Sequence, residues 1–93
     1  MMDSVDDFVE VYQGFIVASY SSAKKAEAER LSHEVLDMGY EIADILESQG
    51  MHGVRGEIEE AVEHILSGMP NLIQSGGEVL GKWAGSYKTL YDE

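Results

Sequence analysis

Residues 4–49 contain no proline, and the second half of this stretch repeats apolar residues at alternating steps of three and four. The repeating residues are Ala28, Leu31, Val35, Met38, Ile42 and Ile45. This spacing places apolar side chains along one side of an α-helix that packs lengthwise against another helix. The pattern therefore predicts an all-α fold, but it says little about function.

The rest of the chain adds further helical segments. Apolar spacing and turn residues predict one α-helical domain over residues 1–93, with helices at about 4–19, 22–49, 57–68 and 78–91. Small helical domains have modest cores and often complete them by association with a second copy. We therefore expect a small helical bundle of three or four helices, with dimerisation as a way to complete it.

The ends of these helices carry recognisable signals. Ser4 followed by Asp7 resembles a capping box, and Gly50 is expected to be a left-handed cap that opens a glycine-rich loop over residues 50–56. The serines at positions 19–22 are either a turn between two helices or a phase slip within one long helix. Clustered serines compete for backbone hydrogen bonds, which favours the turn.

The charge is strongly negative, with 18 acidic residues against 6 basic ones and a net charge of −12. A surface of this sign repels nucleic acid and anionic membranes, and it suits a partner protein with a basic surface. The absence of cysteine excludes disulfides and thiolate chemistry. No apolar run approaches the roughly 18 residues of a membrane span, and no secretory signal is recognisable, so we expect a cytoplasmic protein.

The residues with chemical potential do not form a catalytic or metal-binding motif. Of the histidines His33, His52 and His64, only His64 has a ligand-like neighbour, Glu60 at four residues' distance, so we expect no metal and no cofactor. The glycines of the 50–56 loop flank Arg55, but the loop lacks the lysine and hydroxyl of a phosphate loop. The carboxylates lie on predicted solvated helix faces, and we expect no enzyme.

Two surface features remain as candidate binding sites. The first is an acidic stripe with one carboxylate per turn, formed by Glu34, Asp37, Glu41 and Asp44. Over roughly 15 Å of helix, such a column is able to imitate nucleic-acid charge and occupy a basic groove, although a solvated face is the commoner explanation.

The second feature is the carboxyl-terminal segment. Gly77, Gly81 and Gly85 form a column of small residues, beside a face of Leu80, Trp83, Tyr87 and Tyr91. Tryptophan and tyrosine are enriched at the centres of protein interfaces, so this face is either a docking surface or part of the core. Our predicted partner-binding set is Trp83, Tyr87 and Tyr91, with Leu36, Tyr40 and Leu46 at an oligomer contact.

Trp83-Ala84-Gly85 resembles the Trp-x-Gly tripeptide of the small helical-hairpin proteins exported by type VII secretion. Those proteins are of similar size and acidity, lack cysteine and pair as four-helix dimers. In that family the tripeptide lies in the turn between two long helices, whereas here it lies near the end of the chain. The family's Tyr-x-x-x-Asp/Glu tail is also missing, because Tyr91 occupies the fourth place after Tyr87. We assign the chain to no family on this basis.

The sequence thus favours a non-enzymatic acidic protein, of adaptor or inhibitor type, that binds a protein partner and forms a homodimer without direct contact to nucleic acid or membrane. The first alternative is an acidic nucleic-acid mimic that blocks a DNA- or RNA-binding protein, as some phage-encoded inhibitors do. The remotest alternative is a secreted helical protein of the type VII kind.

Overall fold

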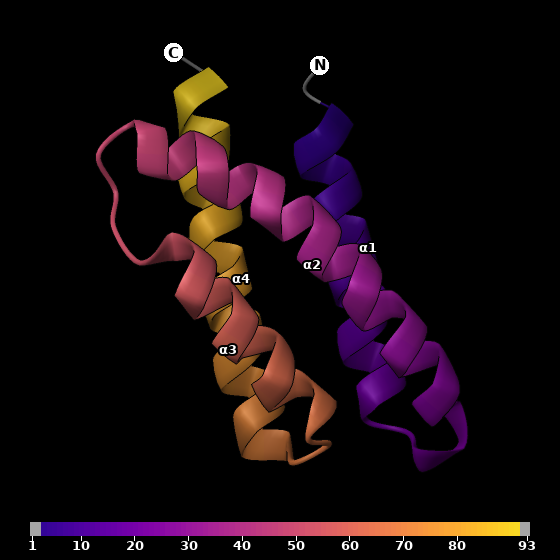
Figure 1. Cartoon of the computed structure of the whole chain (residues 1–93). Helices are drawn as coiled ribbons and strands as arrows, with labels where there is room; N and C mark the ends of the chain where they lie inside the picture. Colours follow the sequence, from indigo (N-terminus) through magenta and orange to yellow (C-terminus); the bar gives the residue numbers. More distant parts are fainter. Residues whose placement is uncertain (1–2, 92–93) are drawn as a thin grey trace.

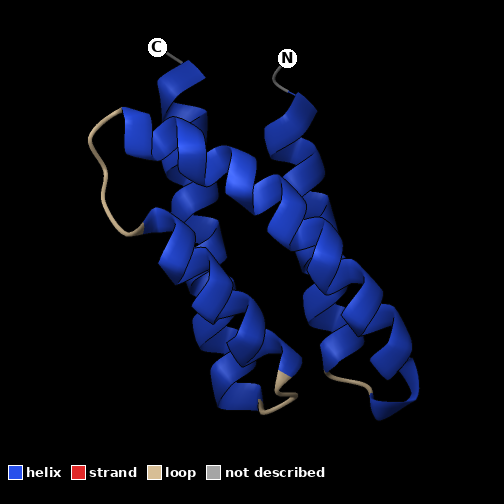
Figure 2. Ribbon diagram, viewed as in Figure 1, coloured by secondary structure: helices blue, strands red, loops and turns tan. Residues whose placement is uncertain are grey.

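The computed structural model describes the backbone of residues 3–91 and the side chains of residues 5–90. Over that range the chain forms four α-helices and no strand, which confirms the all-α prediction (Figures 1 and 2). The helices are α1 (Asp3–Ser19), α2 (Lys25–Ser48), α3 (Val54–Leu66) and α4 (Pro70–Tyr91), with a 3-10 turn η1 (Ser22–Lys24) before α2. None of these helices is long and apolar enough to cross a membrane.

The chain makes two successive helical hairpins that pack together. In Figure 1, α1 and α2 run in opposite directions, as do α3 and α4, and both chain ends lie at the same end of the molecule. Contacts between α2 and α3 and between α1 and α4 join the two hairpins. The result measures 41 × 24 × 17 Å along its principal axes.

The serine segment is a turn, so residues 4–49 form two helices. The amides of Tyr20 and Ser21 donate to the carbonyl oxygens of Val17 and Ala18, which tightens the last turn of α1. Ser21 then takes an extended conformation, with φ −114° and ψ 119°. The α-helical part of the second element begins at Lys25, later than the expected residue 22, because Ser22–Lys24 form the 3-10 turn.

Gly50 is the left-handed cap that the sequence predicts, with φ +97°. Its amide donates to the carbonyl of Glu47, and the amide of Met51 donates to that of Leu46. These two bonds define a Schellman motif, in which a left-handed residue satisfies carbonyls at the end of a helix. They fix the direction in which the chain leaves α2. The Ser4 capping box proposed for α1 involves a side chain outside the described residues.

Helix α3 begins at Val54, earlier than the expected residue 57. Val54 is fully buried, and the amide of Arg55 donates to Glu47 Oε2 across 3.2 Å. A carboxylate from the preceding helix thus takes the place of a local N-cap, which Gly53 cannot supply because it has no side chain. Because this cap comes from a residue eight positions away in sequence, the residues next to the helix start do not reveal it.

Helix α4 begins at Pro70 rather than at Glu78, so the predicted start is eight residues late. Proline favours the first position of a helix, where the amide it lacks would have no intrahelical partner. Gly76 and Gly77, which weaken helix propensity, lie inside the helix because neighbouring helices pack against them. A Cβ on Gly76 would stand 2.6 Å from the carbonyl oxygen of Ala61, and one on Gly77 would stand 2.9 Å from Ile16 Cδ1.

The core lies among all four helices. Its largest fully buried side chains include Phe8, Phe15, Leu46, Ile58, Ile65, Ile73 and Leu80. On α2 the buried face runs through Val35, Gly39 and Ile42, and a Cβ on Gly39 would stand 2.8 Å from Ile58 Cγ2 of α3. The buried line of α2 is therefore shifted from the predicted seam, whose Leu31, Met38 and Ile45 are only partly buried.

We predict opposite effects for two alanine substitutions in α4. Gly76→Ala forces a methyl group against the backbone of α3 and should lower the free energy of unfolding by about 2 kcal/mol. Gly85→Ala meets nothing within 4 Å and should raise it by up to about 1 kcal/mol through helix propensity. Urea unfolding followed by circular dichroism measures both. Equal effects of the two changes would show that α4 does not approach α3 so closely.

Candidate functional site

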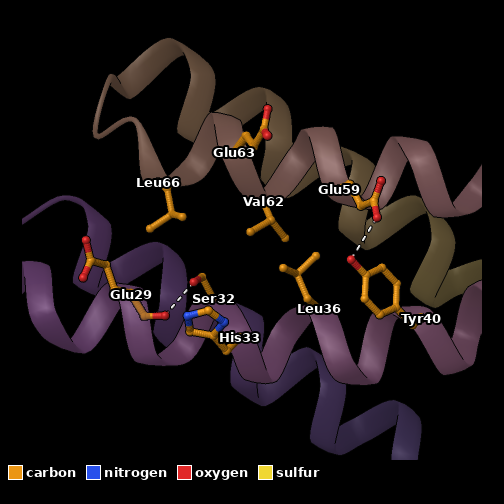
Figure 3. A pocket seen from close by; sticks show the side chains of 9 residues that line it. All are labelled: Glu29, Ser32, His33, Leu36, Tyr40, Glu59, Val62, Glu63 and Leu66. Carbon is orange, nitrogen blue, oxygen red and sulfur yellow. Dashed lines mark hydrogen bonds between the residues drawn. The ribbon is translucent and has the colours of Figure 1, made fainter.

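A groove runs between α2 and α3 on the surface of the protein (Figure 3). Its volume is about 460 Å³, within the range of ligand-binding clefts. The residues that line it are Glu29, Ser32, His33, Leu36, Tyr40, Glu59, Val62, Glu63 and Leu66. We call this feature the α2–α3 groove.

The floor of the groove is apolar. Figure 3 shows Leu36 of α2 and Val62 of α3 converging across the space, with Leu66 reaching toward α2 farther along. Val62 is almost completely buried, Leu36 is half-buried, and Leu66 is 39% exposed. Leu36 and Leu66 therefore keep surface in contact with water that another apolar side chain could cover.

Glutamates stand on both walls of the groove. Glu29 belongs to α2, whereas Glu59 and Glu63 belong to α3, and all three are exposed. Ser32 also lines the groove, but its hydroxyl donates to the carbonyl of Glu29 across 2.6 Å and is satisfied within its own helix. The groove thus combines an apolar floor with an acidic rim.

One end of the groove is closed by a polar network that ties α2 to α3. The Tyr40 hydroxyl donates to Glu59 Oε2 at 2.8 Å, and the Arg55 guanidinium lies 4.5 Å from the centre of the Tyr40 ring. Arg55 Nη2 in turn donates to Asp44 Oδ1 at 2.7 Å. The hydrogen bond to Glu59 raises the pKa of Tyr40 above its ordinary value, with smaller contributions from desolvation and the charge of Glu59.

The acidic stripe is exposed along its whole length. Arginines pair with both of its ends, since Arg30 Nη1 lies 2.9 Å from Glu34 Oε2 and Arg55 contacts Asp44. The hydrogen bond to Asp44 raises the pKa of Arg55 further above its already high ordinary value. The negative charge of the stripe is therefore concentrated at its middle, on Asp37 and Glu41.

Three of the six predicted partner-binding residues pack inside this chain. Leu46 is fully buried, and Trp83 and Tyr87 are each 7% exposed. Trp83 Nε1 donates to Glu57 Oε1 at 3.1 Å, and Lys82 Nζ lies 4.5 Å from the Trp83 ring centre. The burial of Trp83 and Tyr87 agrees with the alternative in which the aromatic face belongs to the core. That of Tyr91 lies outside the described residues.

The glycine column of the carboxyl-terminal segment also serves packing within the chain. Gly77 faces Ile16 of α1, and a Cβ on Gly81 would lie 3.4 Å from the Tyr12 hydroxyl oxygen. The Trp83-Ala84-Gly85 tripeptide lies within α4 and not in a turn. The column thus allows α4 to approach α1 closely.

Of the predicted partner-binding residues whose side chains are described, Leu36 and Tyr40 remain accessible, and both line the α2–α3 groove. Neither the glutamates of the rim nor Val62 and Leu66 of α3 are among the candidate site residues predicted from the sequence. The available signal was the apolar arc of α2, in which Leu36, Tyr40, Ala43 and Leu46 adjoin the predicted seam. This arc is wider than contact with one helix requires. The missing information was which helix lies beside Leu36.

Among the described residues, no group of three or more histidines and carboxylates is placed to hold a metal ion. His64 Nε2 lies 3.9 Å from Glu60 Oε2, as their spacing predicts, while His33 lines the groove and His52 is exposed. At the glycine-rich loop, Glu47 accepts the Arg55 amide at the start of α3. A carboxylate therefore occupies a position where an anion would otherwise bind.

Comparison of the chain with protein-family models, curated proteins and solved structures finds no match.

We predict that the Tyr40 phenol loses its proton above the ordinary tyrosine pKa. Because the folded state holds this proton more tightly, the resulting stability is present below pH 10 and is lost as the pH rises through the raised pKa. NMR titration of the Tyr40 ring measures the shift. Glu59→Gln should lower this pKa by replacing the charged hydrogen-bond acceptor with a neutral amide, whereas Glu60→Gln should leave it unchanged. Equal pKa values in all three proteins would contradict the Tyr40–Glu59 bond.

Proposed function

We propose that the protein is a non-enzymatic adaptor or inhibitor that binds another protein with a basic surface. The observation that supports this most directly is the α2–α3 groove, an accessible apolar floor bordered by glutamates of both helices. Apolar burial supplies affinity in protein association, and complementary charge supplies orientation and rate. The groove offers both kinds of contact to one partner.

The distribution of charge supports a basic partner. In the described residues, three of the six basic side chains already contact carboxylates, namely Arg30, Arg55 and Lys82. Most of the 18 carboxylates consequently contribute to a field of one sign. Such a field accelerates the approach of a positively charged partner and falls with added salt.

We extend the proposal to the packing of the four helices and to the oligomeric state of the protein. Large side chains from all four helices are fully buried within one chain, which supports a four-helix bundle whose core needs no second copy. The homodimer expected from the sequence would need the exposed apolar surface at Leu36 and Tyr40, which also lines the α2–α3 groove, so a second copy and a partner in the groove exclude each other. Light scattering at micromolar concentration distinguishes a monomer from this dimer.

A second candidate function is a nucleic-acid mimic based on the acidic stripe. Its support is the exposure of all four carboxylates along one side of α2. Its weakness is the neutralisation of both ends by arginine. The two candidates use different sides of α2 and can be separated by substitution.

We predict that affinity capture from a lysate of the native host retains a protein partner at low salt and loses most of it at high salt. Two variants with the same change in net charge test the site. Glu29→Lys with Glu63→Lys alters the groove rim, and Asp37→Lys with Glu41→Lys alters the middle of the stripe. The groove variant should capture less of the partner, by about tenfold, and the stripe variant should resemble the unmodified protein.

The opposite result, a loss confined to the stripe variant, would favour the nucleic-acid mimic. Capture of no protein at low salt by the unmodified chain would contradict a function in protein binding.

A further inference from the structure

Resting on this proposed function, we propose that the α2–α3 groove binds one basic amphipathic α-helix of the partner. The apolar face of that helix lies on Leu36, Val62 and Leu66. Its lysines and arginines lie beside Glu29, Glu59 and Glu63.

The shape of the groove fits a helix. Its α2 wall runs from Glu29 to Tyr40, which corresponds to about 16 Å or three helical turns. The floor consists of Leu36 of α2 and Val62 and Leu66 of α3, and the space between the two helices is elongated along them (Figure 3). A helix laid in such a groove contacts it through side chains at positions i, i+3 or i+4, and i+7.

The charge of the groove selects a basic helix. Glutamates flank the apolar floor from both sides, and no lysine or arginine is among the described residues that line it. The nearby Arg55 is directed to Asp44 and to the face of Tyr40. A helix with lysines or arginines on both flanks would therefore meet opposite charge on each wall.

The two ends of the groove differ, and this difference determines toward which end a longer bound helix would extend. The Tyr40–Glu59 hydrogen bond lies at one end (Figure 3). At the other, Glu29 and Leu66 also line a neighbouring hollow of about 410 Å³. Tyr20, which is 56% exposed, lines that hollow and adds apolar surface beyond Leu66. A partner helix longer than three turns would extend toward Tyr20.

A second copy of this chain is a poor occupant of the groove. A symmetric dimer places the same surface patch against itself, so the glutamates of one rim would face those of the other. Each chain also carries a net charge of −12. Like charges brought together at an interface oppose association. Nucleic acid is also negatively charged, so it is a poor occupant of the groove for the same reason.

The test is an NMR titration of the isotope-labelled protein with a synthetic peptide of about 14 residues, or about 21 Å of helix. Leucines occupy one face of this peptide and lysines the remaining positions. One control peptide replaces the lysines with glutamate, and another has the same composition in an order that gives no apolar face. We expect saturable chemical-shift changes at the groove residues of α2 and α3 with the first peptide only.

Substitutions connect the binding to the groove. Glu29→Lys with Glu63→Lys should weaken peptide binding about tenfold, and Leu66→Ser should weaken it about fivefold. Asp37→Lys with Glu41→Lys, which changes the net charge equally, should change it by less than about threefold. All of the substituted side chains are exposed, and circular dichroism verifies that each variant is folded.

The inference would be overturned by shifts that map elsewhere, by equal weakening by the two charge variants, or by binding of the glutamate peptide with similar affinity. A dimer whose contacts cover the groove would also overturn it. If the groove variant captures as much of a host partner as the unmodified protein does, the inference fails while the proposed function stands. If no partner is captured, the proposed function fails whatever the peptide shows.

Discussion

The close approach of α4 to its neighbours determines the arrangement of the other helices. At Gly76 the backbone of α4 lies against the carbonyl of Ala61 in α3, and at Gly77 it lies against Ile16 of α1. A side chain at either position would separate the helices by the size of a methyl group or more, and packed interiors tolerate such changes poorly. The two glycines therefore hold α1 and α3 on adjacent sides of one helix.

This arrangement explains which apolar surface is left over. Once α4 is packed between α1 and α3, Trp83 and Tyr87 are covered, and α1 packs against Gly77 and Gly81. Helix α2 contacts α1 and α3, but its apolar arc extends beyond them to Leu36. Leu36 and Leu66 consequently remain accessible at the α2–α3 groove. The network of Tyr40, Glu59, Arg55 and Asp44 then fixes the separation of the two walls.

Local patterns in the sequence predict much of this fold, because helix periodicity and Gly50 act through neighbouring residues. The boundaries that differ depend on distant residues. Helix α3 begins early because Glu47 caps it from α2, and α4 includes Gly76 and Gly77 because α3 and α1 pack there. The candidate site also depends on residues that are distant in sequence. Periodicity places Leu36 and Trp83 on apolar faces, but only the packing of helices decides that Trp83 is buried and Leu36 only half-buried.

The acidic surface also links stability to binding. Carboxylates crowded on a small protein repel one another, and this repulsion opposes the compact state. Glu29 and Glu63 lie on opposite walls of a groove without a lysine or arginine among its described lining residues, so the chain itself supplies no cation there. A basic helix in the groove would reduce the repulsion and cover Leu36 and Leu66 in one step. Because a ligand that binds only the folded state stabilises it, the same contacts that recognise the partner would make the fold more stable.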